Sequence, residues 1–180
     1  MKSIHLIAPS GAALDHKSPL AGINWLKSQG LSVQNIECVQ RVHERFAGSD
    51  EVRLGDLNQL ATIDPKTVVM AMRGGYGIHR LLPSIDWVGI SNAISNGLQI
   101  SGHSDFTAFQ LGLLAKTGAI TLSGPMLNYD FGSIDESGKA ITPDVFMWKH
   151  FLSAVKERKL DCTICSYRWW YLYQIGRRRR

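Results

Sequence analysis

Short apolar runs alternate with amphipathic stretches along most of the chain. Runs of β-branched and apolar residues predict strands, and apolar residues spaced three or four apart predict helices. We expect five strands, at residues 3–8, 31–38, 67–72, 98–101 and 120–122. We expect five helices, at residues 19–29, 49–60, 87–95, 107–116 and 143–158, with Ser49 as a helix cap. This alternation predicts an α/β fold of three layers, in which helices flank a mostly parallel sheet.

Two glycine-rich segments follow predicted strands. One is Arg-Gly-Gly-Tyr-Gly at residues 73–77, and the other is Gly-His-Ser-Asp at residues 102–105. Ligands of parallel α/β sheets bind outside the carboxyl ends of the strands. We therefore expect the two segments to share one rim of the sheet and to form the functional site.

The segment at residues 102–105 has the order strand, tight turn, helix. A serine on such a turn is lifted above the sheet edge, and the helix N-terminus presents free N–H groups to a developing oxyanion. Ser104 is therefore a candidate nucleophile, although Phe106 replaces the second glycine of the Gly-x-Ser-x-Gly pattern. The alternative is that Ser104 or Asp105 merely caps the helix, and the tetrapeptide alone favours this alternative.

The glycine loop at residues 73–77 brings backbone N–H groups close to any bound anion. It is suited to half of an oxyanion hole or to binding a substrate carboxylate, and Arg73 and Arg80 offer charge for such a carboxylate. The alternatives are a tight turn for the loop, and for the arginines an ion pair with Asp86 or contact with solvent. The loop matches neither the phosphate-binding nor the dinucleotide-binding glycine pattern.

Charge and cysteine content narrow the function classes. The net charge is +5, but all 15 acidic residues and 15 of the 20 basic residues precede residue 167. A balanced body gives no electrostatic reason to expect nucleic acid as a partner. No apolar stretch reaches the ~20 residues of a membrane span, and the first apolar run is too short for a secretory signal, so we expect a cytoplasmic protein. Three cysteines argue against a disulfide scaffold, and we interpret Cys162 and Cys165 as buried small side chains rather than as a zinc or redox pair.

Taken together, the motifs resemble the LD-carboxypeptidase (muramoyltetrapeptide carboxypeptidase) family, which includes the microcin-C immunity peptidases. The resemblance covers most of residues 4–127 in the right order. It is carried by Ala8-Pro9-Ser10, Arg45-Phe46-Ala47-Gly48-Ser49-Asp50, residues 73–77, Arg80-Leu81-Leu82-Pro83, Ile85-Asp86, residues 102–105 with Thr107-Ala108, and Gly124-Pro125-Met126.

The resemblance implies a flavodoxin-like N-terminal domain of a serine peptidase. It implies release of a terminal D-amino acid from an L,D bond of a muropeptide or other small peptide, with no metal and no cofactor. Ser104 is the implied nucleophile, and the backbone N–H groups of Asp105 and Gly75 are the implied oxyanion donors. We expect Arg73, Gly74 and Tyr76 to bind substrate, and a homodimer is compatible with the family. His103 stands where the family commonly has another aromatic ring.

The resemblance also implies groups that this sequence does not show. The family's catalytic histidine and its glutamate lie in a second domain. We interpret the six histidines here as structural, because none has an acid at a suitable spacing: His5, His16, His43, His79, His103 and His150. Residues 1–160 are expected to form the nucleophile-bearing domain, and residues 161–180 the start of a linker with an atypical aromatic and arginine tail.

That tail favours a truncated or frameshifted reading frame over an evolved membrane-surface or nucleic-acid tail. As such a truncated chain, the protein is expected to be an inactive or impaired carboxypeptidase. Two alternatives stay open: a non-catalytic module that binds a peptide carboxylate, and a small hydrolase that recruits its base from a partner chain.

Overall fold

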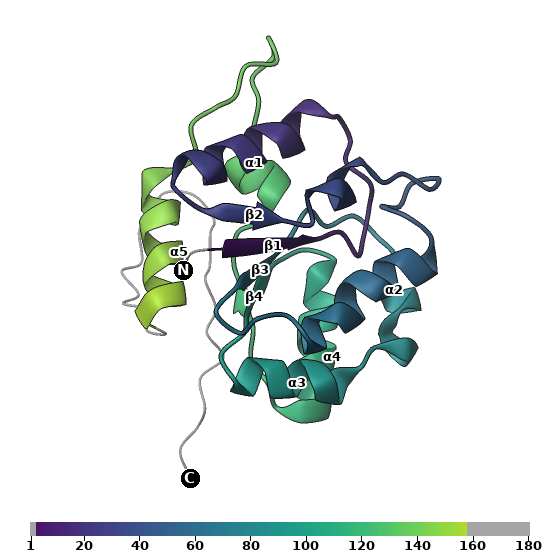
Figure 1. Ribbon diagram of the computed structural model, residues 1–180. Coiled ribbons are helices and arrows are strands. Elements are labelled where there is room, and N and C mark those ends of the chain that lie inside the picture. Colours follow the sequence, from purple (N-terminus) through teal and green to yellow (C-terminus); the bar gives the residue numbers. More distant parts are fainter. Residues whose placement is uncertain (1–2, 158–180) are drawn as a thin grey trace.

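A five-stranded, all-parallel sheet forms the centre of the computed structural model, which describes residues 3–157 (Figure 1). The strand order is β2-β1-β3-β4-β5. The strands are β1 (Ser3–Ile7), β2 (Ser32–Gln34), β3 (Val68–Ala71), β4 (Gln99–Gly102) and β5 (Leu122–Ser123). The predicted parallel α/β sheet is confirmed, because each predicted strand is present.

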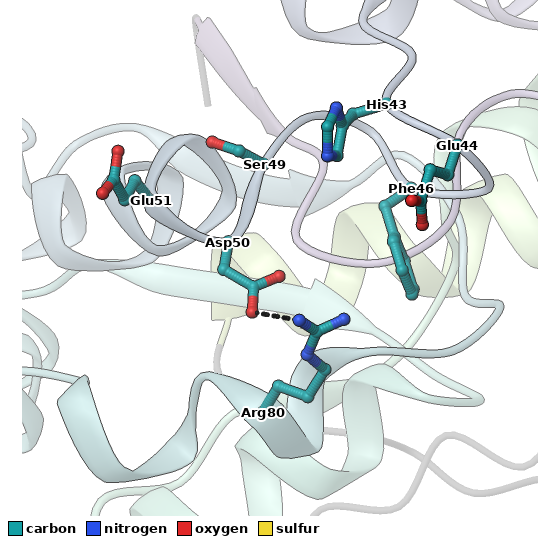
Figure 2. A pocket seen from close by; sticks show the side chains of 7 residues that line it. All are labelled: His43, Glu44, Phe46, Ser49, Asp50, Glu51 and Arg80. Atoms are coloured by element: carbon teal, nitrogen blue, oxygen red, sulfur yellow. Dashed lines mark ion pairs between the residues drawn. The ribbon is translucent and has the colours of Figure 1, made fainter.

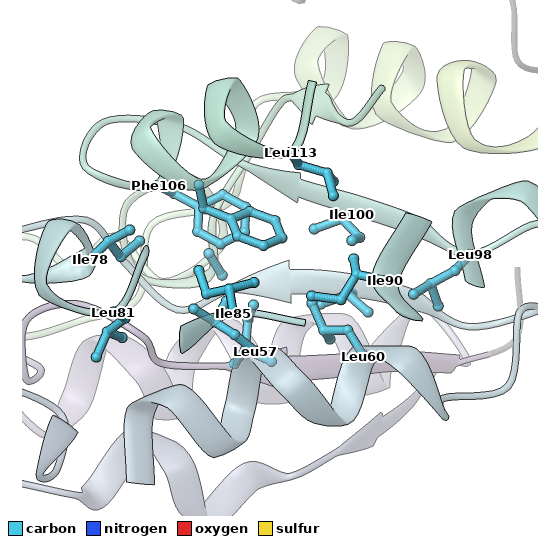
Figure 3. Packing of buried hydrophobic residues seen from close by; sticks show 14 of the residues in the cluster. Leu57, Leu60, Ile78, Leu81, Ile85, Ile90, Leu98, Ile100, Phe106 and Leu113 are labelled. Atoms are coloured by element: carbon cyan, nitrogen blue, oxygen red, sulfur yellow. The ribbon is translucent and has the colours of Figure 1, made fainter. Parts of the chain in front are cut away.

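Helices cover both faces of this sheet, which confirms the three-layer architecture (Figure 1). They are α1 (Lys17–Ser28), α2 (Asp50–Asn58), α3 (Trp87–Ser95), α4 (Phe106–Thr117) and α5 (Val145–Glu157). Side chains alternate between the two faces along each strand. Val69 and Ala71 of β3 therefore pack under α2, α3 and α4, while Val68 and Met70 pack under α1 and α5. Figure 3 shows the first of these two clusters, where Phe106 and Leu113 of α4 meet Ile100 of β4.

Two local features differ from the sequence-based prediction. The strand expected over residues 31–38 ends at Gln34, because Asn35 adopts a left-handed conformation with φ 55° and a 3₁₀ helix (Ile36–Gln40) follows. The Asn35 side-chain amide donates a hydrogen bond of 2.7 Å to the Leu6 carbonyl oxygen, which holds this turn. A π-helix (Leu127–Phe131) packed against α1 was also not predicted.

The remaining expectations concern helix ends and the chain termini. Ser49 does cap α2, since its Oγ accepts a hydrogen bond of 3.4 Å from the Val52 N–H. Within residues 3–157, no helix is both long enough and apolar enough to cross a membrane. Cys162, Cys165 and the proposed linker at residues 161–180 lie outside the described residues, so the domain boundary at residue 160 stays a prediction.

Candidate active site

The two glycine-rich segments meet at the carboxyl ends of β3 and β4, which are neighbours in the sheet. The contact is so close that a Cβ atom on Gly74 would lie 2.7 Å from Ser104 Oγ and 2.8 Å from Ser104 Cβ. Only glycine allows this approach without displacement of Ser104. The prediction that both segments share one rim is therefore confirmed, and it follows from the strand order.

Ser104 itself is exposed and has a strained backbone. Its φ of 60° lies in the left-handed region, where a side chain costs about 1–2 kcal/mol. Such strain at a non-glycine residue is typical of functional sites, because the surrounding structure has to enforce it. Among residues 3–157 no hydrogen bond reaches the Ser104 hydroxyl.

The turn before Ser104 explains why Phe106 replaces the expected second glycine. A Cβ atom on Gly102 would collide with the buried Phe106 ring and would lie 3.1 Å from Ala71 Cβ. The ring fills the space under the turn, so glycine is required at residue 102 and an aromatic side chain is accommodated at 106. Asp105 occupies the N-cap position of α4 but makes no capping hydrogen bond, and the capping alternative is therefore wrong.

The Asp105 carboxylate instead joins the turn to two other strand ends. Its Oδ2 accepts a hydrogen bond of 2.9 Å from the hydroxyl of Ser10, which is fully buried after β1. The same oxygen accepts a 3.3 Å bond from the backbone N–H of Ile78, at the end of the glycine loop. Sequence reasoning assigned only the backbone of Asp105 and missed both this side chain and Ser10.

The glycine loop is also held by the segment after β1. Gly75 has φ 125°, and a Cβ atom on it would lie 3.1 Å from the Gly11 nitrogen. Gly11 N–H donates to the Gly74 carbonyl oxygen at 3.3 Å. Arg73 is half-buried, and its Nη1 donates to the Ala12 carbonyl oxygen at 2.7 Å. At least one edge of the Arg73 guanidinium therefore holds the loop together, and its binding of substrate stays a prediction.

Beyond Gly77 the rim opens into a hollow of about 420 Å³ (Figure 2). A Cβ atom on Gly77 would lie 2.7 Å from Phe46 Cε1, so the Phe46 wall of the hollow packs directly on the glycine loop. Arg80 forms an ion pair of 2.9 Å with Asp50 across the hollow, and not with Asp86 as one alternative suggested. The hollow is lined by His43, Glu44, Phe46, Ser49, Asp50, Glu51 and Arg80.

Tyr76 of the glycine loop and Arg45 are both exposed and lie next to each other. The Arg45 guanidinium lies 4.9 Å from the centre of the Tyr76 ring, and Tyr76 is 50% exposed. The Tyr76 hydroxyl is 3.3 Å from Nε2 of His79. The sequence did not identify Arg45 as a source of positive charge at the site, because Arg45 and Tyr76 are 31 residues apart and only the fold brings them together.

One histidine contradicts the expectation that none has a nearby acid. His103 Nε2 lies 3.3 Å from Oδ2 of Asp130, a buried carboxylate that also accepts a 2.7 Å bond from Met126 N–H. The 27-residue separation gives no recognisable spacing, so no sequence signal was available. His5, by contrast, lies in β1 with its pKa lowered mainly by burial.

No group of three or more His, Cys, Asp or Glu side chains within residues 3–157 could hold a metal ion.

Comparison with known proteins gives a consistent result. A family model described as the LD-carboxypeptidase N-terminal domain matches residues 4–124. A probable murein peptide carboxypeptidase of Bacillus subtilis is 31% identical over 134 residues, which cover 74% of this chain and 40% of that protein. The microcin C7 self-immunity protein of Escherichia coli is 32% identical over 111 residues, which cover 62% of this chain and 31% of that protein.

Solved structures agree with these sequence matches. The crystal structure of muramoyltetrapeptide carboxypeptidase from Oxalobacter formigenes superposes with a TM-score of 0.70 at 36% identity, over 86% of this chain and 48% of that one. A structure of a microcin C7 self-immunity protein in complex with aspartyl sulfamoyl adenosine gives a TM-score of 0.71 at 25% identity, over 86% and 44% of the two chains. The chain thus spans between about a third and a half of the length of these relatives.

Proposed function

Because the chain belongs to the LD-carboxypeptidase family, we propose that it carries the nucleophile of a serine-type carboxypeptidase acting on murein-derived peptides. The proposed reaction releases a terminal D-amino acid from an L,D peptide bond. Ser104 is the proposed nucleophile, and the proposed substrate is a muropeptide or another small peptide. A cytoplasmic location and a homodimer belong to the same proposal.

The observation that carries this proposal is the free hydroxyl of Ser104 beside two unused backbone donors. Neither the Asp105 N–H nor the Gly75 N–H donates a hydrogen bond within residues 3–157. The Asp105 nitrogen lies 3.3 Å from the position of a Cβ atom on Gly74, next to Ser104. An N–H group that is buried by a ligand needs a hydrogen-bond acceptor, because a buried N–H without a partner costs free energy. An anionic ligand or a developing oxyanion at the rim is a suitable acceptor for these two donors.

In the proposed reaction Ser104 Oγ attacks the carbonyl carbon of the L,D peptide bond. The hydroxyl proton passes to a general base, and the carbonyl oxygen becomes an oxyanion held by the N–H groups of Asp105 and Gly75. The C–N bond then breaks, the proton is returned to the leaving amine, and the D-amino acid departs. Water hydrolyses the resulting Ser104 ester and restores the hydroxyl. Arg73 and Arg45 supply positive charge near the terminal carboxylate.

The general base of this scheme has to come from outside residues 3–157. A serine hydroxyl is a weak nucleophile without a base, and within the described part of the chain no side chain forms a hydrogen bond with the Ser104 hydroxyl. His103 lies next to Ser104 in sequence, but its Nε2 faces Asp130. Residues 158–180 contain no histidine, and we therefore propose that the 180-residue chain binds the substrate but hydrolyses it slowly or not at all.

The experiment uses the full 180-residue chain and a murein tetrapeptide that ends in D-alanine. Binding is measured by calorimetry, with the diastereomer that ends in L-alanine as the matched ligand. D-alanine release is measured with increasing free-base imidazole as an external base. We expect binding that prefers the D-alanine peptide, and slow release that rises with imidazole in the wild type but not in Ser104→Ala. Release that is unaffected by Ser104→Ala, or equal binding of the two peptides, would contradict the proposal.

A non-catalytic peptide-binding module is the second candidate, and the absence of a hydrogen bond from any base to the Ser104 hydroxyl within residues 3–157 favours it. A fluorophosphonate probe separates the two candidates. Labelling at Ser104, with or without imidazole, supports the peptidase, whereas peptide binding without labelling under either condition supports the module. Labelling that appears only with a second polypeptide would support a hydrolase that takes its base from a partner chain.

A further inference from the structure

The structure contains a three-way contact at the catalytic rim that the proposed reaction does not yet use. One oxygen of Asp105, Oδ2, accepts hydrogen bonds from the Ser10 hydroxyl at 2.9 Å and from the Ile78 N–H at 3.3 Å. Ser10 follows β1, Ile78 follows the glycine loop after β3, and Asp105 follows β4. These are the three neighbouring central strands of the sheet. We call this contact the Asp105 lock.

The β1 side of the lock is rigid. Ser10 is fully buried, and its carbonyl oxygen accepts a 3.1 Å bond from Ala47 N–H. The preceding carbonyl oxygen, of Pro9, accepts a 2.7 Å bond from the guanidinium of Arg53, which is itself fully buried. A hydroxyl fixed in this way has little freedom to follow a displaced carboxylate, so it defines where Asp105 lies.

The glycine loop, by contrast, needs an external anchor. Gly75 and Gly77 both have positive φ, at 125° and 120°, and glycine gives the backbone many alternative conformations. One end of the loop is held where Gly74 contacts Ser104, and the other end is held where Ile78 N–H bonds to Asp105. Both anchors belong to the turn at residues 102–105, so both ends of the loop are positioned relative to Ser104.

Charge alone would make an aspartate unfavourable at this position. A carboxylate one residue after the nucleophile opposes an oxyanion that develops beside it. Two hydrogen bonds from fixed donors offset that effect only in part, so the reason for the carboxylate is its geometry. Its backbone N–H is one proposed oxyanion donor, and its side chain positions the loop that carries the other donor, Gly75.

We propose that Asp105 and Ser10 are positioning residues that set the separation between the two oxyanion donors. This inference rests on the proposed function, because it assigns the donors to Asp105 and Gly75. The lock should increase affinity for the tetrahedral transition state and leave affinity for the bound peptide unchanged. A displacement of about 1 Å is enough to cost ~10²-fold in rate, so a loosened loop should lower transition-state affinity while ground-state affinity stays nearly constant.

The test compares two ligands of the 180-residue chain by calorimetry. One is the tetrapeptide that ends in D-alanine, and the other is its phosphinate, in which a tetrahedral P–O⁻ group replaces the scissile amide. Neither measurement requires a general base. The wild type is expected to bind the phosphinate more tightly than the peptide, because the oxyanion donors meet a full negative charge.

Ser10→Ala and Asp105→Ala should each lower phosphinate affinity by about 10–100-fold, which is below the ~10²–10³-fold cost of losing a donor outright. Peptide affinity should change by less than about threefold in both variants, since the donors still exist. Asp105→Asn keeps an acceptor oxygen for both partners and removes the opposing charge, so its phosphinate affinity should equal or exceed that of the wild type. The double variant should lose no more than Asp105→Ala alone, because that change already removes the contact with Ser10.

Ser101→Ala is the matched control. Ser101 is also fully buried, and its hydroxyl donates a 2.9 Å hydrogen bond to the Pro125 carbonyl oxygen and not to the lock or the glycine loop. It should lower thermal stability to a similar degree and leave the phosphinate preference unchanged. Additive losses in the double variant, a loss of phosphinate affinity in Asp105→Asn as large as in Asp105→Ala, or equal losses for both ligands would overturn the positioning role.

Amide hydrogen exchange shows whether the lock exists, independently of whether the proposed function is correct. Exchange at Ile78 should accelerate in Ser10→Ala but not in Ser101→Ala, and unchanged exchange would overturn the lock itself. If the wild type shows no preference for the phosphinate while exchange at Ile78 does respond, the lock exists but the oxyanion assignment is wrong. That result would overturn the proposed function and the positioning role together.

Discussion

We expect Gly74→Ala to displace Ser104 through a steric clash, and the structure gives the distances involved. The new methyl group would lie 2.7 Å from Ser104 Oγ and 2.8 Å from Ser104 Cβ. Carbon atoms are in favourable contact at about 3.5–4.0 Å, so the methyl group and Ser104 Cβ have to separate by about 0.7–1.2 Å. The φ of Gly74 is not in the left-handed region, so the substitution strains the contact and not the local backbone.

This displacement has two expected magnitudes. Overpacking of this kind costs about 1–3 kcal/mol of stability, which corresponds to a fall in Tm of about 2–12 °C for a domain of this size. Misplacement of the nucleophile by about 1 Å should reduce transition-state affinity by ~10²-fold. The assays are thermal unfolding and calorimetric binding of the phosphinate peptide.

Gly55→Ala is a matched control with the opposite expected sign. Gly55 lies exposed inside α2, and a Cβ atom there would meet nothing within 4 Å. Alanine is favoured over glycine in a helix interior by about 0.5–1 kcal/mol, so Tm should rise by roughly 1–4 °C and phosphinate binding should not change. If Gly74→Ala behaves like Gly55→Ala in both assays, the close approach of the glycine loop to Ser104 is refuted.

Three further substitutions or probes test other features. Ser104→Gly should abolish the imidazole-dependent release of D-alanine and still raise Tm by about 2–4 °C, since relief of the left-handed strain contributes ~1 kcal/mol; a lower Tm than that of Ser104→Ala would argue against strain at this turn. Burial raises the pKa of the Cys38 thiol far above its ordinary value, so iodoacetamide should label Cys38 only after unfolding, as located by peptide mapping, and rapid labelling of the native chain would contradict its burial. Hydrogen bonding from the Ser18 N–H lowers the pKa of Asp15 below 3.8. The stabilisation from ionised Asp15 is therefore complete above that pH and is lost as the pH falls through the folded-state pKa, so the difference in unfolding free energy between wild type and Asp15→Asn should disappear in acid; a difference that grows in acid would reverse the sign.

Much of the fold follows from local patterns in the sequence. Continuous apolar runs placed β1 and β3, helical spacing placed α3 at its observed bounds, and the order of these elements is sufficient for a parallel sheet. The errors occur where a single polar residue overrides the pattern. Asn35 ends β2 early because its side chain bonds to Leu6 across the sheet, a contact that local propensity does not contain.

For the candidate site, too, some features are visible in the sequence and others are not. Its two segments are visible in the sequence, because each is a glycine-rich segment that directly follows a predicted strand and because the carboxyl ends of parallel strands lie at one rim. The sequence also gives the family resemblance, which the match over residues 4–124 bears out. The partners of the side chains are not visible, because hydrogen bonds between segments 27 to 95 residues apart leave no trace in spacing.

The sequence by itself therefore determined the order of the elements, the parallel sheet and the identity of the two loops. Only the tertiary structure decided that Asp105 faces Ser10 and Ile78, that His103 faces Asp130, and that Arg80 pairs with Asp50. The physical reason is the distance along the chain over which each interaction acts. Backbone conformation and amphipathic pattern are set by neighbours along the chain, whereas the direction of a polar side chain at the rim is set by whichever donor or acceptor the folded sheet brings within about 3 Å.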